Sequence, residues 1–175
     1  MIRLFSSVVG NPIICIDNGF TDYKLTAFVV DTDRLAIELA VVQQPFNPRR
    51  YYIMPRSIRE VGSQSIIINS DEDISEAEDL VRYQTIIDAK PYLIGYRVAS
   101  SSNQKLGFVK DFGFDSIHLT ISKLVVRSHW TRRILTKDLL ISRSQIIKIE
   151  NKTVIVKETK TKARKTSAKL LPVSS

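Results

Sequence analysis

The side chains that most often carry out chemistry are few in this sequence, and they form no catalytic or metal-binding pattern. The two histidines, His118 and His129, have no paired cysteines, so a zinc site is not expected. Cys15 is the single cysteine and lies in an apolar run, where a buried, inert thiol is expected rather than a nucleophile. No glycine spacing matches a phosphate-binding loop. We therefore expect no enzyme, no cofactor and no metal.

A dense acidic run offers a second candidate for chemistry, because carboxylates bind calcium. Six acids stand between Asp71 and Asp79, but the run lacks the glycine and the ligand spacing of an EF-hand. A solvated connector is the expected structure. Apolar residues between Ser75 and Asp88 are spaced as on a short helix, and Pro91 then returns the chain to an extended form. Residues 73–91 are thus predicted to form an acidic, partly helical linker.

Arginine pairs beside aromatic residues occur at two matching places and are the candidate binding residues. Arginine makes bidentate contacts to carboxylate or phosphate, and exposed aromatic rings anchor protein interfaces. The same composition suits RNA, where aromatic rings stack on bases, and it also suits a hairpin rim whose rings fold back onto the protein. The residues are Arg49, Arg50, Tyr51 and Tyr52 in the first place, and Arg127, His129, Trp130, Arg132 and Arg133 in the second.

The formal net charge of +8 is concentrated near one end of the sequence. Residues 159–175 contain five bases and no acid, so the remainder carries only +3. This composition predicts a disordered arm that meets an anionic membrane surface, or that only aids solubility. The five bases are Lys160, Lys162, Arg164, Lys165 and Lys169.

Short runs of β-branched and aromatic residues, separated by turn-forming residues, predict strands throughout the sequence. Their even spacing favours small antiparallel barrels or sandwiches. The longest apolar runs have four residues, so no membrane span is expected, and the first residues lack the apolar core of a secretory signal. The predicted strands are 13–16, 27–30, 37–42, 51–54 and 66–68, then 98–100, 108–109, 112–114, 120–126, 139–141 and 154–156.

The two halves of the sequence repeat one another at two offsets. Residues 31–42 match 115–126 in their aspartate and apolar positions, 84 residues later. Residues 53–68 match 141–156 in the same way, 88 residues later. The difference of four places an insertion in the hairpin loop that holds residues 128–133, where extra residues are tolerated. The pattern indicates a tandem repeat. Asp31 and Asp115, each just after a strand, are predicted to form turns.

Two segments of the second repeat carry a resemblance to a known family. They are residues 93–98, Leu-Ile-Gly-Tyr-Arg-Val, and residues 105–115, Lys-Leu-Gly-Phe-Val-Lys-Asp-Phe-Gly-Phe-Asp. Residues 8–13 and 53–62 of the first repeat are similar to the same family. These features resemble the PRC-barrel domain, a small β-barrel named for the cytoplasmic part of the photosynthetic reaction-centre H subunit. Tyr23 and Ala27 depart from the pattern, standing where the second repeat has glycine and aspartate.

The resemblance implies a mainly β fold of two tandem small antiparallel β-barrels. The expected divisions are a first PRC-barrel-like repeat at 1–72, the acidic linker at 73–91, a second repeat at 92–158 and the basic disordered tail at 159–175. Each barrel is small enough that packing against its twin is expected to contribute to stability.

The same resemblance implies a non-enzymatic adaptor or assembly protein that docks on a larger protein complex, in connection with photosynthetic complexes. Stand-alone double-barrel members are familiar from cyanobacteria. The expected location is the cytoplasm, or the stroma of a plastid, with peripheral association at a photosynthetic membrane. An RNA- or ribosome-associated protein is the alternative, because the bacterial ribosome maturation factor also ends in a PRC barrel. Its different amino-terminal domain has no match in residues 1–72, so RNA ranks second.

Overall fold

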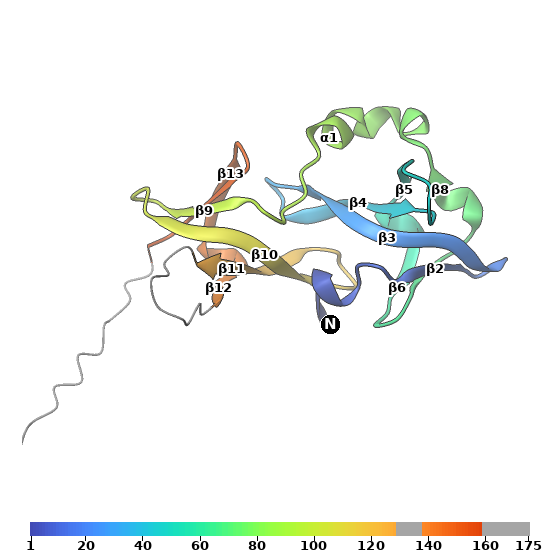
Figure 1. Cartoon of the computed structure of the whole chain (residues 1–175), viewed down its shortest axis with the longest axis horizontal. Coiled ribbons are helices and arrows are strands. Elements are labelled where there is room, and N and C mark those ends of the chain that lie inside the picture. Colours follow the sequence, from blue (N-terminus) through green and yellow to red (C-terminus); the bar gives the residue numbers. More distant parts are fainter. Residues whose placement is uncertain (129–137, 159–175) are drawn as a thin grey trace, which may run out of the picture.

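The computed structural model describes residues 1–128 and 138–158 and shows a mainly β protein, as predicted (Figure 1). Two seven-stranded sheets lie side by side. No helix in these residues is long and apolar enough to cross a bilayer. The first sheet contains β2 (Pro12–Cys15), β3 (Gly19–Asp31), β4 (Ala36–Gln43), β5 (Tyr51–Ile53), β6 (Ile58–Val61), β7 (Ile66–Ile68) and β8 (Ile74–Ser75). The second contains β1 (Ile2–Leu4), β9 (Arg97–Ser100), β10 (Lys105–Asp115), β11 (Ile121–Ser128), β12 (Asp138–Ser142), β13 (Ile146–Glu150) and β14 (Thr153–Val156).

The two sheets have the same strand order. The first runs β6-β7-β2-β3-β4-β5-β8, and the second runs β13-β14-β9-β10-β11-β12, with β1 added on β10. In both sheets one pair is parallel, β2 with β7 and β9 with β14. The long strands β3 and β10 carry bulges at positions that are 84 residues apart, and bulges bend a strand and increase its twist. The result is a curled half-barrel sheet; closure into two separate barrels stays a prediction.

A reciprocal pair of backbone hydrogen bonds joins the two halves. The Ile37 amide donates to the Leu119 carbonyl at 2.7 Å, and the Ile121 amide donates to the Leu35 carbonyl at 2.8 Å. Because donor and acceptor exchange roles between equivalent positions, the halves meet about a local pseudo-two-fold axis. β4 and β11 therefore run away from this junction in opposite directions.

An aspartate turn precedes the junction in each half, as the sequence predicts. The Asp115 carboxylate accepts the backbone amides of His118 and Ile117, both at 2.8 Å, and Asp31 accepts the two equivalent amides in its own turn. These amides hold the pKa of Asp115 well below its usual range. The turns leave Leu35 and Leu119 with φ of 52°, which aims their carbonyl groups at the opposite half.

A single hydrophobic core runs through both halves. Phe28 of β3 packs edge-on against Phe114 of β10, with ring centroids 5.3 Å apart. Phe5 stacks on Phe112 at 5.1 Å and also meets Phe28 at 5.7 Å. Burial of such rings contributes about 1.5–3 kcal/mol each. Each half therefore completes the core of the other.

Residues 71–91, which we call the acidic segment, do more than connect the two halves, although Asp71, Glu72, Glu78 and Asp79 are exposed as their composition predicts. After β8 it forms short 3₁₀ turns and the helix α1 (Gln84–Ala89). Leu80 and Ile87 are each only 6% exposed, because they pack on Val29 and Leu39 at the outer face of the first sheet. The segment thus covers that face, as the position of α1 above β3 and β4 shows (Figure 1).

The first seven residues belong to the second sheet in space. β1 pairs with β10, from Ile2 opposite Asp115 to Leu4 opposite Gly113. The nearly buried carboxylate of Asp111 accepts the backbone amide of Ser6 at 3.0 Å and its hydroxyl. We call this contact the amino-terminal clip. It crosses the boundary expected at residue 72, since residues 1–7 fall within the expected first repeat but pack on the second.

We expect Asp111→Ala to destabilise the protein by about 2–3 kcal/mol, because three hydrogen bonds lose their acceptor, including that of the Phe112 amide. Ser6→Ala should cost about 1 kcal/mol alone and almost nothing in the Asp111→Ala background. Urea unfolding of the four proteins of this cycle measures the coupling. Asp33→Ala, at an exposed carboxylate without a side-chain contact in the described residues, is the control and should leave the midpoint unchanged. If the stability losses of Ser6→Ala and Asp111→Ala simply add in the double variant, the contact between the two residues does not stabilise the protein.

Candidate functional site

The first arginine pair is exposed in the loop between β4 and β5. Arg49 forms an ion pair with Glu76 of the acidic segment, with a nitrogen to oxygen distance of 2.5 Å. Arg50 donates to the Tyr92 hydroxyl at 3.3 Å, and its guanidinium carbon lies 5.7 Å from the centre of the Tyr92 ring. Arg49 also lies over an aromatic ring, with its guanidinium carbon 5.9 Å from the centre of the Tyr51 ring. Both arginines are therefore beside a tyrosine, and in the described residues only Arg49 has a carboxylate partner.

The two tyrosines of the predicted set turn inward. Tyr51 is half-buried and meets the ring of Tyr23 edge-on, with centroids 5.1 Å apart. Tyr52 is only 5% exposed beneath the acidic segment, and this burial raises its pKa. Tyr52 is therefore a core residue, and we remove it from the candidate binding surface.

Of the second arginine set, the described residues contain only Arg127, which lies at the other end of the molecule from Arg49 and Arg50. Arg127 is exposed near the end of β11, and β11 runs away from β4 at the central junction. Extended strands of these lengths place the far ends of β4 and β11 up to about 45 Å apart. The structure therefore does not bring Arg127 close to the first set. The remaining predicted residues, His129, Trp130, Arg132, Arg133, Lys160, Lys162, Arg164, Lys165 and Lys169, lie outside the described residues.

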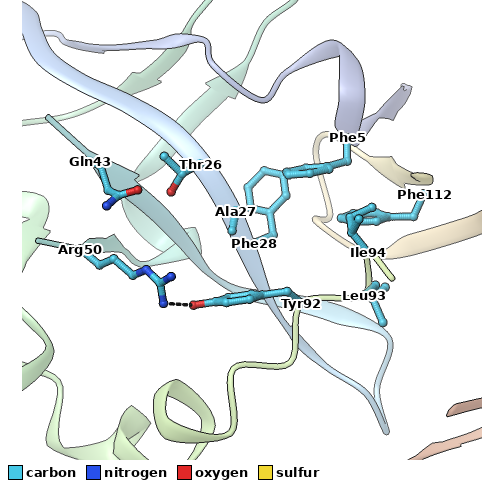
Figure 2. A pocket seen from close by; sticks show the side chains of 10 residues that line it. All are labelled: Phe5, Thr26, Ala27, Phe28, Gln43, Arg50, Tyr92, Leu93, Ile94 and Phe112. Carbon is cyan, nitrogen blue, oxygen red and sulfur yellow. Dashed lines mark hydrogen bonds between the residues drawn. The ribbon is translucent and has the colours of Figure 1, made fainter. Parts of the chain in front are cut away.

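A groove of about 410 Å³ opens beside Arg50, where the two halves and the amino terminus meet (Figure 2). We call it the Arg50 groove. Its apolar end consists of aromatic and aliphatic side chains from both halves, and its polar end lies toward β4 and β5. The lining residues are Phe5, Ala27, Phe28, Leu93, Ile94 and Phe112 at the apolar end and Thr26, Gln43, Arg50 and Tyr92 at the polar end.

The polar end has unused hydrogen-bonding capacity. Thr26 and Gln43 each donate one hydrogen bond to a backbone carbonyl, which leaves their oxygen atoms able to accept others. Arg50 has five N–H donors and uses one of them on Tyr92. Among the described residues it has no carboxylate partner. Arg50 is therefore a ready donor for an anionic group placed at this end.

The groove is built to bind rather than to transfer protons. None of its lining residues is a histidine, cysteine, aspartate or glutamate. In the described parts of the chain, no three His, Cys, Asp or Glu side chains gather as metal ligands would. An apolar wall next to an arginine matches a molecule that carries an apolar body and a negative charge.

Sequence reasoning found only Arg50 among these ten residues. Phe5 lies next to Ser6 of the amino-terminal clip, Tyr92 follows the acidic segment, and Phe112 belongs to the second repeat. No local pattern links positions so far apart. The tandem repeat was the available signal, because it implies a seam between two halves, and grooves form preferentially at such seams.

We expect anilinonaphthalene sulfonate, an apolar anion, to bind the Arg50 groove and to gain fluorescence there. Arg50→Gln should raise its Kd about tenfold, which corresponds to one charge-assisted hydrogen bond of about 1.4 kcal/mol. Arg49→Gln removes the same charge one residue away, outside the groove, and should change Kd less than twofold. A fluorescence titration of the folded proteins checks both values. Equal weakening by the two variants would exclude a specific role for Arg50.

No protein-family model matches this chain, and no curated protein matches it either. The likeness to the PRC-barrel domain therefore stays a prediction from the residues that carry it.

Proposed function

We propose that the protein is a non-enzymatic adaptor that docks on a larger protein complex. The Arg50 groove binds a segment of the partner protein that is apolar and carries a carboxylate. The observation that carries this proposal is an arginine without a carboxylate partner in the described residues, beside an apolar wall contributed by both halves. Arginine and tyrosine at the border of an apolar pocket are the residues that dominate protein interfaces.

The volume of the groove supports a small anchor rather than a large ligand. About 410 Å³ accommodates a few side chains, such as a short apolar stretch followed by an acid. The walls come from paired strands and from a packed aromatic cluster, so little ordering is needed when the partner arrives. A preformed pocket with one fixed cation favours recognition of a defined peptide segment.

The resemblance to the PRC-barrel domain extends the proposal to the kind of complex. It supports two tandem barrels as the full architecture and a photosynthetic complex as the partner, in the cytoplasm or stroma, with peripheral membrane association through the basic tail. Each base near an anionic leaflet adds about 1 kcal/mol, an attraction that salt weakens. His129, Trp130, Arg132 and Arg133, which lie outside the described residues, remain proposed partner contacts.

RNA or the ribosome is the second candidate, favoured by the net charge of +8. The distribution of that charge weighs against it. Residues 129–137 and 159–175 hold eight Lys and Arg and no acid, so the other 18 bases are balanced by all 18 acids of the chain. Binding to nucleic acid depends mainly on many phosphate contacts from a basic surface. The described residues carry no net charge and thus favour a protein partner.

A capture experiment from native lysate separates these candidates. We expect the tagged full-length protein to retain the same partner proteins after nuclease treatment, and Arg50→Gln to lose most of them while Arg49→Gln keeps them. Quantitative mass spectrometry of the captured proteins gives the ratio for each variant. Loss of binding after nuclease, with ribosomal proteins dominating the untreated sample, would refute the adaptor and support the RNA alternative.

A further inference from the structure

A second groove of about 410 Å³ runs along the outer edge of β12 in the second sheet. We call it the β12 groove. Leu139 is 40% exposed and Leu140 is 66% exposed, which is unusual for neighbouring leucines on a strand. In the described residues no strand pairs with this side of β12. Unpaired strand edges offer free backbone groups to another chain.

The tandem repeat shows what occupies the equivalent place in the first half. Six residues of the β12 groove are Leu139, Leu140, Ile141, Gln145, Val156 and Lys157. Their counterparts, 88 residues earlier, are Tyr51, Tyr52, Ile53, Ser57, Ile68 and Asn69. The chain itself covers this counterpart site, because the acidic segment crosses it and forms β8 on the edge of β5.

Three contacts hold that covering segment in place. Ile74 lies opposite Ile53 in the antiparallel ladder and packs on the core, and Ser75 lies opposite Tyr52. One residue earlier, the Asp73 carboxylate accepts the hydroxyl of Ser57 at 2.7 Å. The segment thus supplies strand hydrogen bonds, one apolar side chain and one carboxylate.

The second half does not encode the same cover. At the 88-residue offset, Thr161 occupies the position equivalent to Asp73, and Lys162 occupies the position equivalent to Ile74. The residues that follow β14 therefore lack both the carboxylate and the apolar side chain. Gln145, which replaces Ser57, uses its side-chain oxygen on Ser142, and in the described residues its amide nitrogen is left as a donor.

The sequence that adjoins β12 and the end of the second sheet is basic, which favours an acidic occupant. The positively charged residues 129–137 join the chain at Asp138, the first residue of β12. The positively charged residues 159–175 join it at Glu158, which lines the groove. These two stretches hold eight Lys and Arg and no acid, so the protein as a whole attracts an acidic segment more strongly than a basic one.

We propose that the β12 groove binds an extended acidic segment of a partner protein, which adds as an antiparallel strand to β12 in the way that β8 adds to β5. The segment places an aliphatic side chain opposite Ile141 and a carboxylate near Gln145, in the order Asp-Ile found at Asp73 and Ile74. Strand addition supplies affinity through backbone hydrogen bonds, and the pockets for alternate side chains supply specificity. The β12 groove is a different surface from the Arg50 groove, so this proposal does not depend on the proposed function of that groove.

The chain's own covering segment provides the probe. We expect a fluorescein-labelled peptide Ser-Asp-Glu-Asp-Ile-Ser-Glu-Ala, the sequence of residues 70–77, to bind the full-length protein in fluorescence anisotropy, more weakly as salt increases. A peptide with glycine in place of isoleucine should bind at least tenfold more weakly. Absence of binding at low salt, or equal binding of the two peptides, would overturn the proposal.

Variants of the protein locate the binding. Leu139→Glu combined with Leu140→Glu should weaken the peptide at least tenfold, because both side chains are exposed and the new charges repel it. Ile147→Glu, at an exposed isoleucine of β13 outside the groove, is the matched control and should change Kd less than twofold, as should Arg50→Gln. Circular dichroism verifies that each variant is folded. Equal effects of the groove variant and the Ile147 control would overturn the proposal.

Two further outcomes identify a different occupant. Tighter peptide binding by a full-length variant with Leu170→Ser and Leu171→Ser would mean that the end of the chain competes for the groove, against a partner segment. Displacement of the peptide by a short oligouridine at equal concentration would assign the groove to nucleic acid. We expect neither substitution nor oligouridine to change peptide affinity more than twofold.

Discussion

The structure depends on one shared core, which neither half can build alone. Phe28 comes from the first sheet and Phe112 and Phe114 from the second, and Phe5 joins them from the amino terminus. Units of roughly 70 residues bury a smaller share of their surface than larger domains do, so joining two cores into one gains stability without lengthening the chain. The reciprocal hydrogen bonds at the junction then set the relative orientation of the halves, and the Arg50 groove exists only because of that orientation.

The two halves share one strand order but differ in the surfaces that they present. In the first half, the acidic segment pairs with β5 and buries Leu80 and Ile87, so its edge and its outer face are both covered. In the second half no described residue pairs with the same edge, which lies beside exposed leucines. Duplication therefore allows one copy to supply stability while the other keeps an edge for recognition. This division explains how a protein with few reactive side chains acquires specific surfaces.

Local patterns in the sequence predicted most strands, the two aspartate turns and the matching offsets, because these depend on neighbouring residues. The features that the sequence did not predict all depend on contacts between residues that are far apart in the sequence. The composition of residues 71–79 indicated solvent, yet Leu80 and Ile87 beyond it find an apolar face on β3 and β4. Tyr52 looked like part of an exposed loop but is covered by the same segment. The Arg50 groove needed Phe5 and Tyr92 from separate regions, and no spacing in one sequence encodes such a meeting.

The pairing of β1 with β10 also constrains the order in which the protein forms during its synthesis. Ile2 is synthesised 113 residues before its partner Asp115. At about 5–20 residues per second, this interval lasts roughly 6–23 seconds. During that time Phe5 has no aromatic partner from the second sheet. The pairing of β1 must therefore wait until β10 has been made, and both sheets share this delay because Phe5 also meets Phe28.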